Sequence, residues 1–263
     1  MGDKTVAEIE KISLLGIIVT FSRVHFVRKF VAIGAVLFSA CALTVLADGI
    51  ADYYRQVPAS RDGIGKSYMG REIAQVMGFQ GAQWLEREER EQEERGDLLL
   101  RELALKPGMD VLDVGAGTGY YSRRIAAFVA PRGKIYAIDV QREMVDILST
   151  VAKQPEFSNV RPVLGTEKSV ALPDGVADLA IMVDVYHELE FPVEMLASIT
   201  RALRPGGRVV FVEYRAEDPN VPIKALHKMS EAQIRREAEQ NGLIWERTAN
   251  TLPWQHVVIF KTK

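Results

Sequence analysis

The sequence predicts an α/β fold in which a mostly parallel β-sheet carries helices on both faces. An apolar, β-type run at 111–114 ends in the glycine-rich turn 115–119, and a helix-forming run follows at 120–129. Similar strand-type runs recur at 135–140, 159–165, 177–183 and 209–214, and two closing strands are predicted at 243–247 and 256–261. Strands separated by helices in this way pair in parallel.

The strand, turn and helix at 111–129 are predicted to bind a nucleotide. Gly115, Gly117 and Gly119 lack a Cβ, so the backbone can approach a ligand that the free N–H groups of the next helix also face. The glycines are spaced G-x-G-x-G, and Asp113 lies two positions before the first, whereas a dinucleotide turn has the spacing G-x-G-x-x-G. This spacing disfavours the alternative of a nicotinamide-dependent oxidoreductase.

The segment 111–119, VLDVGAGTG, resembles motif I of class I S-adenosylmethionine-dependent methyltransferases. The run 135–139 is similar to the family's second strand, which ends in a ribose-binding acid, and 203–208 is similar to the turn into its fifth strand. The resemblance covers residues 98–263. It implies S-adenosyl-L-methionine as cofactor and a Rossmann-like sheet of seven strands whose last strand is antiparallel.

The resemblance also implies which residues hold the cofactor. Asp113 would receive its ammonium group, directly or through water, and Asp139 would hold the ribose, because one carboxylate can accept hydrogen bonds from two hydroxyls. Thr166 stands where an acid usually contacts adenine, so either Glu167 or the backbone takes that role. The full predicted set is Asp113, Gly115, Ala116, Gly117, Gly119, Asp139, Val140, Thr166, Glu167 and Asp184.

The predicted fourth strand, 177–183, leads into the polar run DVYHEL at 184–189. In open α/β sheets the ligand crevice lies beyond the carboxyl ends of the strands, so this run is predicted at the reacting centre. His187 matches a histidine that is frequent here in the family, and a neutral imidazole can accept a proton. His187 is therefore the candidate general base, with Asp184 and Tyr186 as further catalytic candidates. A histidine that only packs or caps a helix is the alternative.

Candidate acceptor-binding residues come from two other segments. The fifth strand leads to Glu213 and Arg215, and the polar excursion at 216–229 contains His227. Such an excursion often carries substrate contacts in methyltransferases. Tyr68 and Arg71 are candidates from the segment before motif I, for which ordinary packing is the alternative.

The resemblance implies that residues 48–97 form an N-terminal helical extension that covers the site as a cap or lid, because the segment before motif I commonly does so in this family. Apolar residues at helical spacing predict a short helix at 71–77. The charged stretch 85–95 is predicted to be a largely solvated helix, on which Glu86 and Arg90, and likewise Glu91 and Arg95, are four residues apart.

Composition limits the class of partner. The 33 basic and 35 acidic side chains give a formal charge of −2, so no bulk attraction for nucleic acid is expected. The single cysteine, Cys41, excludes an internal disulfide framework and a multi-cysteine metal site, and no metal is predicted. The predicted acceptor is a small molecule with a thiol, hydroxyl or amine. A protein side chain and a non-catalytic, membrane-tethered cofactor-binding domain are the alternatives.

Residues 1–47 are predicted to be a signal peptide or a membrane anchor. Basic residues precede 30–47, a run of 18 residues without a charge that Asp48 ends. This segment would associate with the membrane and place the domain, 98–263, at the membrane or in the periplasm. That location conflicts with a cofactor made in the cytosol. A buried helix is one alternative, and a start downstream of Met1, which would leave the protein cytoplasmic, is another.

Overall fold

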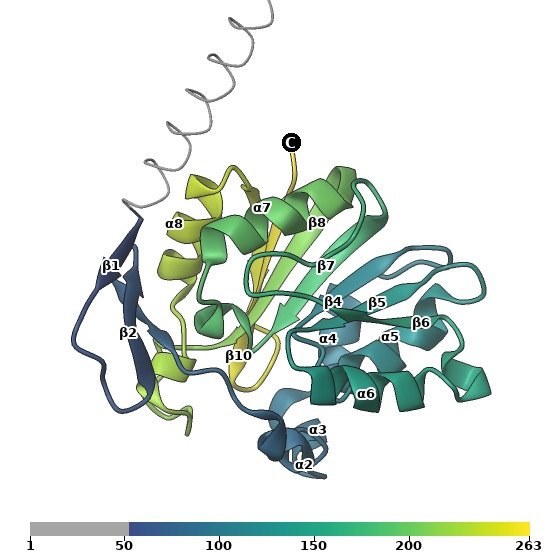
Figure 1. Ribbon diagram of the computed structural model, residues 1–263, viewed down its shortest axis with the longest axis horizontal. Coiled ribbons are helices and arrows are strands. Elements are labelled where there is room, and N and C mark those ends of the chain that lie inside the picture. The colour runs from purple at the N-terminus through teal and green to yellow at the C-terminus, as the bar shows by residue number, and fades with distance from the viewer. Residues whose placement is uncertain (1–52) are drawn as a thin grey trace, which may run out of the picture. The chain divides into compact units, whose positions relative to one another are not determined.

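The computed structural model describes residues 53–263 (Figure 1). The chain divides into two units, 1–54 and 55–263, and the second contains the sheet and helices that position the site. The predicted signal or anchor segment, including 30–47, lies outside the described residues. Within residues 53–263 every helix is too short or too polar to cross a membrane.

A seven-stranded sheet forms the centre of the second unit, in the order β6-β5-β4-β7-β8-β10-β9 (Figure 1). The five strands from β4 to β8 are parallel, and β10 runs antiparallel to both β8 and β9. The strands are β4 (Val111–Val114), β5 (Ile135–Asp139), β6 (Val160–Leu164), β7 (Ala177–Val183), β8 (Leu203–Tyr214), β9 (Ile244–Ala249) and β10 (Gln255–Lys261). The predicted mostly parallel sheet with an antiparallel last strand is confirmed.

Helices cover both faces of this sheet, and each face has its own apolar core. On one face α4 (Gly96–Glu102), α5 (Tyr120–Val129) and α6 (Arg142–Val151) pack on side chains such as Val210. On the other face α7 (Pro192–Ala202) and α8 (Glu231–Gln240) pack on side chains such as Phe211. Successive strand residues point to opposite faces, so strands that are buried on both sides are apolar throughout.

Strand order reverses between β4 and β7, and this reversal positions the site. From β4 the chain continues outward to β5 and β6 in one direction, and it then returns to β7 and β8 on the other side of β4. The connections at the carboxyl ends of β4 and β7 therefore diverge to opposite faces. A crevice opens between them, as is general for open α/β sheets.

The segment that precedes the sheet differs from the prediction. Residues 54–74 form a three-stranded sheet of β1 (Tyr54–Gln56), β2 (Gly63–Tyr68) and β3 (Arg71–Ala74), so the helix predicted at 71–77 is wrong. Met69 and Gly70 join β2 to β3 with φ values of 47° and 94°. Positive φ at both central residues is the geometry of a tight hairpin turn. This turn chemistry outweighs the helical spacing of the apolar residues.

The residues between β3 and the sheet form short helices instead of the predicted solvated helix over 85–95. These are η1 (Phe79–Gly81), α2 (Ala82–Leu85) and α3 (Arg90–Glu94). Glu86 pairs with Arg123, and Glu91 pairs with Arg124. Both arginines lie on α5, and in each pair Nη2 of the arginine is 2.7 Å from Oε2 of the glutamate. The predicted pairs four residues apart are therefore not formed, because both acids bind the neighbouring helix.

Candidate active site

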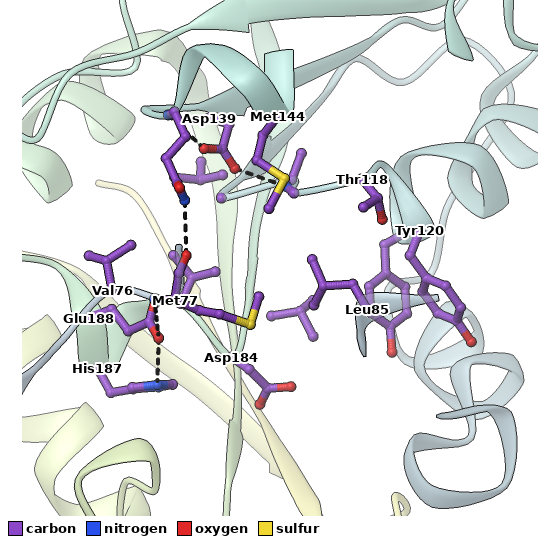
Figure 2. Close-up of a pocket in the computed structure, with 18 of the residues that line it drawn as sticks. Val76, Met77, Leu85, Thr118, Tyr120, Asp139, Met144, Asp184, His187 and Glu188 are labelled. Atoms are coloured by element: carbon purple, nitrogen blue, oxygen red, sulfur yellow. Dashed lines mark hydrogen bonds and ion pairs between the residues drawn. The ribbon is translucent and has the colours of Figure 1, made fainter. Parts of the chain in front are cut away.

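A cavity of about 420 Å³ lies at the carboxyl ends of β4, β5 and β7 (Figure 2). Its volume is within the roughly 300–1,000 Å³ that is usual for cofactor and small-molecule sites. Val76 and Met77 after β3, and Trp84 and Leu85 of α2, complete its wall. Figure 2 shows Met77 and Leu85 between Asp139 and Met144 on one side and Asp184 on the other. The predicted crevice is thus partly enclosed by the segment before the sheet.

The glycine turn forms the floor of this cavity. Gly115 and Gly117 have φ values of +72° and +55°, a conformation that residues with a Cβ rarely adopt. A Cβ at Gly117 would lie 2.7 Å from Leu85 Cδ1. The N–H groups of Gly115 and Ala116 both donate to the carbonyl of Ile138 at 2.9 Å, which holds the turn against the end of β5. The turn is therefore fixed before any ligand binds.

Asp139, the last residue of β5, is oriented by backbone N–H donors, two of which make short hydrogen bonds to its carboxylate. Gly117 N–H donates to its Oδ2 at 3.0 Å, and Gln141 N–H donates to its Oδ1 at 2.9 Å. Each carboxylate oxygen keeps a further lone pair for a hydroxyl of a ligand. Burial raises the pKa of Asp139, and the three backbone donors around it, including Val140, oppose that increase. The arrangement fits a pair of neighbouring ribose hydroxyls.

Asp113 lies on β4 and is almost fully buried at the edge of the cavity. Ser122 Oγ donates to its Oδ2 at 2.6 Å. Burial raises the pKa of Asp113 to about 6, although the hydrogen bond from Ser122 and the nearby Arg90 guanidinium oppose the increase. A buried carboxylate of this kind gains a favourable partner when a cation enters the cavity. It fits the ammonium group of an amino-acid ligand.

The remaining residues predicted to bind the cofactor differ in whether they line the cavity. Ala116, Val140 and Thr166 line the cavity, whereas Glu167 is not part of its lining. The Glu167 side chain is therefore not placed for the adenine contact, and the backbone at Thr166 stays the other candidate. Gly119 ends the turn with a φ of +85° and starts α5.

Asp184, the residue after β7, also lines the cavity, with a φ of +54°. Gln255 Nε2 donates to its Oδ2 at 2.7 Å, whereas no described residue donates to the buried Oδ1. Burial, reinforced by the neighbouring Glu94 and Glu213 carboxylates, raises the pKa of Asp184 well above its ordinary value. Asp184 is therefore a third carboxyl group, after Asp113 and Asp139, that is available to a ligand in this cavity.

A buried polar cluster around Glu94 adds residues that sequence reasoning missed. Glu94 is fully buried and accepts hydrogen bonds from Arg90 Nε at 2.8 Å and from Tyr121 OH at 3.1 Å. Tyr214 OH donates to its other oxygen at 3.2 Å. Arg90, Tyr121 and Tyr214 all line the cavity. Within the acidic stretch no local signal distinguishes Glu94 from its solvated neighbours, because its burial results from contacts with α5 and β8.

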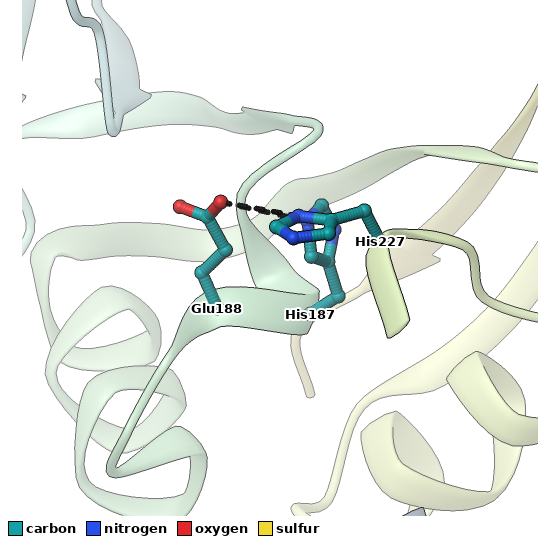
Figure 3. A group of neighbouring side chains, drawn as sticks. All are labelled: His187, Glu188 and His227. Atoms are coloured by element: carbon teal, nitrogen blue, oxygen red, sulfur yellow. Dashed lines mark hydrogen bonds and ion pairs between the residues drawn. The ribbon is translucent and has the colours of Figure 1, made fainter. Parts of the chain in front are cut away.

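His187 lies in η3 (Tyr186–Glu188), at the end of the cavity away from the glycine turn, and is 2% exposed (Figures 2 and 3). Its Nδ1 is 2.6 Å from Glu213 Oε2, and its Nε2 is 3.1 Å from His227 Nδ1. Glu188 Oε1 is 3.7 Å from His187 Nε2 and 3.5 Å from His227 Nδ1. Burial alone lowers the pKa of His187, but the Glu213 carboxylate outweighs burial and the net change is upward. His187, Glu188 and His227, which we call the His187 cluster, all line the cavity.

Glu213, predicted to bind the acceptor, is instead fully buried behind His187 and does not line the cavity. Besides the His187 ring, its carboxylate accepts a hydrogen bond from Tyr186 N–H at 2.8 Å. Glu213 therefore orients His187. Of the predicted acceptor-binding residues, His227 is the one that reaches the cavity.

The structure corrects three other predictions. Tyr186 is fully buried in the core, where its ring packs on Phe211 at 4.8 Å between centroids, so it is not at the reacting centre. Tyr68 is also fully buried, and its hydroxyl accepts a hydrogen bond from Asn241 Nδ2 at 2.8 Å. Arg215 donates to the carbonyl groups of Leu252 and Gln255. Tyr68, Tyr186 and Arg215 do not line the cavity.

Arg71 also serves a different role from the predicted one. Its guanidinium binds both carboxylate oxygens of Glu237 on α8, at 2.7 and 3.1 Å. It also donates to the carbonyl of His187 at 3.1 Å. Arg71 is absent from the lining of the cavity and instead holds η3, the turn that carries His187 and Glu188.

Residues 105–258 match the protein family described as the methyltransferase domain. A crystal structure of a SAM-dependent methyltransferase from Aquifex aeolicus superposes with a TM-score of 0.68 at 26% identity, covering 72% of this chain and 100% of that one. The demethylmenaquinone methyltransferase of Geobacillus sp. (strain WCH70) is 25% identical over 43% of this chain and 49% of its own length. The ubiquinone/menaquinone biosynthesis C-methyltransferase of Ectopseudomonas mendocina is 27% identical over 46% of this chain and 47% of its own length. The chain spans about half the length of these two curated relatives.

The cavity and the family match agree on the cofactor. The glycine turn leaves room for a ligand, Asp139 fits a ribose, and Asp113 fits an ammonium group, while Met77, Leu85 and Met144 provide apolar contacts. The residues present therefore fit S-adenosyl-L-methionine, which is the cofactor. With the matched segment covering more than half of its length, the chain belongs to the family of class I S-adenosylmethionine-dependent methyltransferases.

Proposed function

We propose that this chain transfers a methyl group from S-adenosylmethionine to a small molecule through a thiol, hydroxyl or amine, with His187 as the general base. The observation that carries the proposal is that Asp139 and His187 line one cavity. The cofactor supplies an electrophilic methyl group on a sulfonium sulfur. The tasks left to the protein are to align the acceptor, to exclude water and to remove a proton.

The contacts of His187 support the role of a base. Its Nδ1–H donates to the Glu213 carboxylate at 2.6 Å, and this assignment leaves the lone pair on Nε2. His227 is then the donor in the 3.1 Å contact between the two rings. An acceptor that displaces this contact would place its own proton against Nε2. The raised pKa of His187 favours that proton transfer.

The rim of the cavity supports an acceptor with an apolar or aromatic body. Val76, Trp84 and Val140 line the cavity and are 50%, 45% and 40% exposed. Apolar side chains around a site favour ligands that bury apolar surface there. One curated relative named above is a demethylmenaquinone methyltransferase, and the other is a C-methyltransferase of ubiquinone/menaquinone biosynthesis. Their names support the ring of the acceptor and not the atom that is methylated. A hydroxylated aromatic ring is therefore the first acceptor to test.

A panel of acceptors tests the proposal. The full chain is incubated with S-adenosylmethionine and with phenols, hydroquinones, thiols, amines and a protein mixture, and the product S-adenosylhomocysteine is measured. Methylation of a small molecule is the expected result. Methylation of protein alone would overturn the acceptor class. Cofactor binding without any product would show a non-catalytic domain.

Replacement of His187 tests the base. His187→Ala is expected to lower turnover by about 10²–10⁴-fold and to leave the affinity for S-adenosylhomocysteine within about twofold. Asp139→Asn is the reciprocal control, because it should weaken cofactor affinity first. Unchanged turnover in His187→Ala would remove this residue from the mechanism. The membrane or periplasmic location predicted from residues 30–47 stays a prediction, which fractionation of cells tests.

A further inference from the structure

We propose that the His187 cluster is a binding site for a divalent transition-metal ion such as Zn²⁺. The site consists of His187 Nε2, His227 Nδ1 and one carboxylate oxygen of Glu188 (Figure 3). Two histidines and one glutamate form a ligand set that zinc and related ions use in catalytic sites. The proposal that the ion binds depends only on how His187, His227 and Glu188 are arranged. The catalytic role of the ion rests in addition on the proposed function.

The distances between the three ligand atoms fit one small ion. They are 3.1 Å between the two ring nitrogens, and 3.7 and 3.5 Å from Glu188 Oε1 to His187 Nε2 and His227 Nδ1. Ligands about 2.0–2.2 Å from a tetrahedral zinc ion are separated by roughly 3.3–3.6 Å. The three atoms therefore need only shifts of a few tenths of an ångström to share an ion. Without the ion, the two ring nitrogens are within hydrogen-bonding distance of each other.

Glu213 prepares His187 to be a ligand. Its fully buried carboxylate accepts the Nδ1–H of His187 at 2.6 Å, which directs the Nε2 lone pair toward His227 and Glu188. A carboxylate behind a histidine in this way is the usual partner of metal-binding imidazoles, where it fixes the tautomer and the ring orientation. The main chain of the same turn is held by Arg71, at 3.1 Å from the carbonyl of His187.

The surroundings also favour a cation with an open coordination position. The side chains of His187, Glu188 and His227 are 3%, 13% and 22% exposed, and all three line the cavity. Three protein ligands facing a cavity leave at least one position for an acceptor, which is the pattern of catalytic rather than structural zinc sites. The nearby cations are neutralised, because Arg71 is paired with Glu237 and Lys224 is paired with Asp62.

The ion would take over the task that the proposed function gives to the His187 base. His187 Nε2 becomes a ligand, and an acceptor thiol or hydroxyl at the open position loses its proton to solvent because the ion lowers its pKa. The electron pair of that heteroatom forms the bond to the methyl carbon. The bond from methyl carbon to sulfur breaks, and sulfur keeps its electron pair. The cofactor half of the proposed site is unchanged.

Metal binding is measured directly on the full chain after removal of ions with a chelator. We expect Co²⁺ to produce visible d–d absorption with a stoichiometry of one per chain, and Zn²⁺ to abolish it by competition. His227→Gln and Glu188→Gln should each weaken Zn²⁺ affinity about 100-fold or more. Glu213→Gln should weaken it by about 10–100-fold. Glu190→Gln, two residues from Glu188 and outside the cluster, is the matched control and should bind Zn²⁺ like the wild type.

Binding of S-adenosylhomocysteine, measured by calorimetry on the same preparations, separates the two proposals. Retained cofactor binding without stoichiometric Co²⁺ or Zn²⁺ binding would overturn the metal site and leave the methyltransferase proposal intact. Metal binding that His227→Gln and Glu188→Gln do not weaken would place the ion elsewhere and also overturn it. Metal binding without cofactor binding would instead contradict the proposed function. Thermal unfolding of each variant confirms that it is folded.

Discussion

A Cβ added to Gly115 would lie 2.5 Å from Cγ2 of Val185, which is closer than two carbon atoms that are not bonded to each other can approach. Gly115 follows β4 and Val185 follows β7, so this contact joins the two connections that diverge at the reversal of strand order. Both residues line the cavity. The glycine is therefore required both by its φ of +72° and by the side chain packed against it.

Gly115→Ala should weaken cofactor binding. The methyl group must displace Val185, and overpacking of this kind costs about 1–3 kcal/mol, which corresponds to roughly 5–150-fold in affinity. Calorimetric titration with S-adenosylhomocysteine measures the change.

Gly206→Ala is the matched control for this variant. Gly206 has a φ of +75°, and nothing lies within 4 Å of an added Cβ. Both variants carry the strain of a left-handed conformation, but only Gly115→Ala should lose cofactor affinity. Equal affinity losses in the two variants would show a general loss of folded protein and not an effect of the contact with Val185 at the cavity.

Cofactor affinity should depend on pH, because burial raises the pKa of the Asp113 carboxyl group. Its carboxyl has a pKa of about 6 in the free protein, so it is mostly neutral below that pH. Because an ammonium group favours the ionised form, binding should lower this pKa. Affinity for S-adenosylhomocysteine should then rise with pH, by up to about tenfold per unit below pH 6. Calorimetry from about pH 5 to about pH 8 measures the slope.

The same group has an opposite effect on the stability of the cofactor-free protein. Because burial raises its pKa above the ordinary 3.8, the folded state retains a proton that the unfolded state has released between these two values. Its contribution to the free energy of unfolding therefore falls as pH rises through this window. Asp113→Asn should remove both effects. An unchanged affinity slope in that variant would assign the pH dependence to another group, such as Asp139.

Glu213→Gln should lower turnover more than it lowers cofactor affinity. The variant keeps the shape of the side chain but removes the charge that orients the His187 ring from 2.6 Å away. Loss of such a positioning group costs about 10–100-fold in activity. Steady-state kinetics should show the loss in kcat, with KM for the cofactor nearly unchanged.

Two further variants test the interpretation of Glu213. Glu213→Asp restores the charge and should recover part of the activity, which a purely structural role would not require. Glu246→Gln removes a carboxylate on β9, far along the sheet from His187, and should leave kcat as in the wild type. If Glu213→Gln turned over substrate normally, His187 would need no orienting partner.

Arg71→Met should destabilise the protein by about 3–5 kcal/mol, because it leaves the fully buried Glu237 carboxylate without its bidentate partner. Chemical denaturation measures the loss. The double variant Arg71→Met/Glu237→Leu should recover part of it, since neither buried charge then remains. Arg101→Met, which removes a largely exposed partner of Asp97, should cause no measurable change. If Arg71→Met lost no more stability than the Arg101→Met control, water would have to solvate the Glu237 carboxylate.

The strand, turn and helix at 111–129 could be predicted from the sequence because their causes are local. Glycine spacing fixes where the strand ends, and the structure places β4 and α5 within the predicted limits. The strand at 177–183 is also where the prediction put it. The hairpin of β2 and β3, at 63–74, was missed because the positive φ of Met69 at its turn is not visible in the residue type.

Pairing of charges could not be predicted from spacing. An exposed pair four residues apart is worth only about 0.3–0.5 kcal/mol, so contacts with another helix easily replace it. Glu86 and Glu91 accordingly bind α5. Arg90 forms a different pair four residues apart, with Glu94 of its own helix, and that pair is buried. Buried pairs of this kind depend on which elements pack together.

The sequence by itself predicted the family and the cofactor, through the resemblance of its glycine turn and two further segments to known methyltransferases. It also predicted the order of the strands from residue 111 onward, because apolar strands and glycine turns are set by a few neighbouring residues. Only the tertiary structure decided which polar side chains meet. It buried Tyr186 in the core, moved Glu213 behind His187, and brought His227 from a distant connection to within 3.1 Å of the same ring. The physical reason is that successive side chains of a strand or turn point in different directions. Which of them reaches the cavity depends on how the whole sheet twists and is covered.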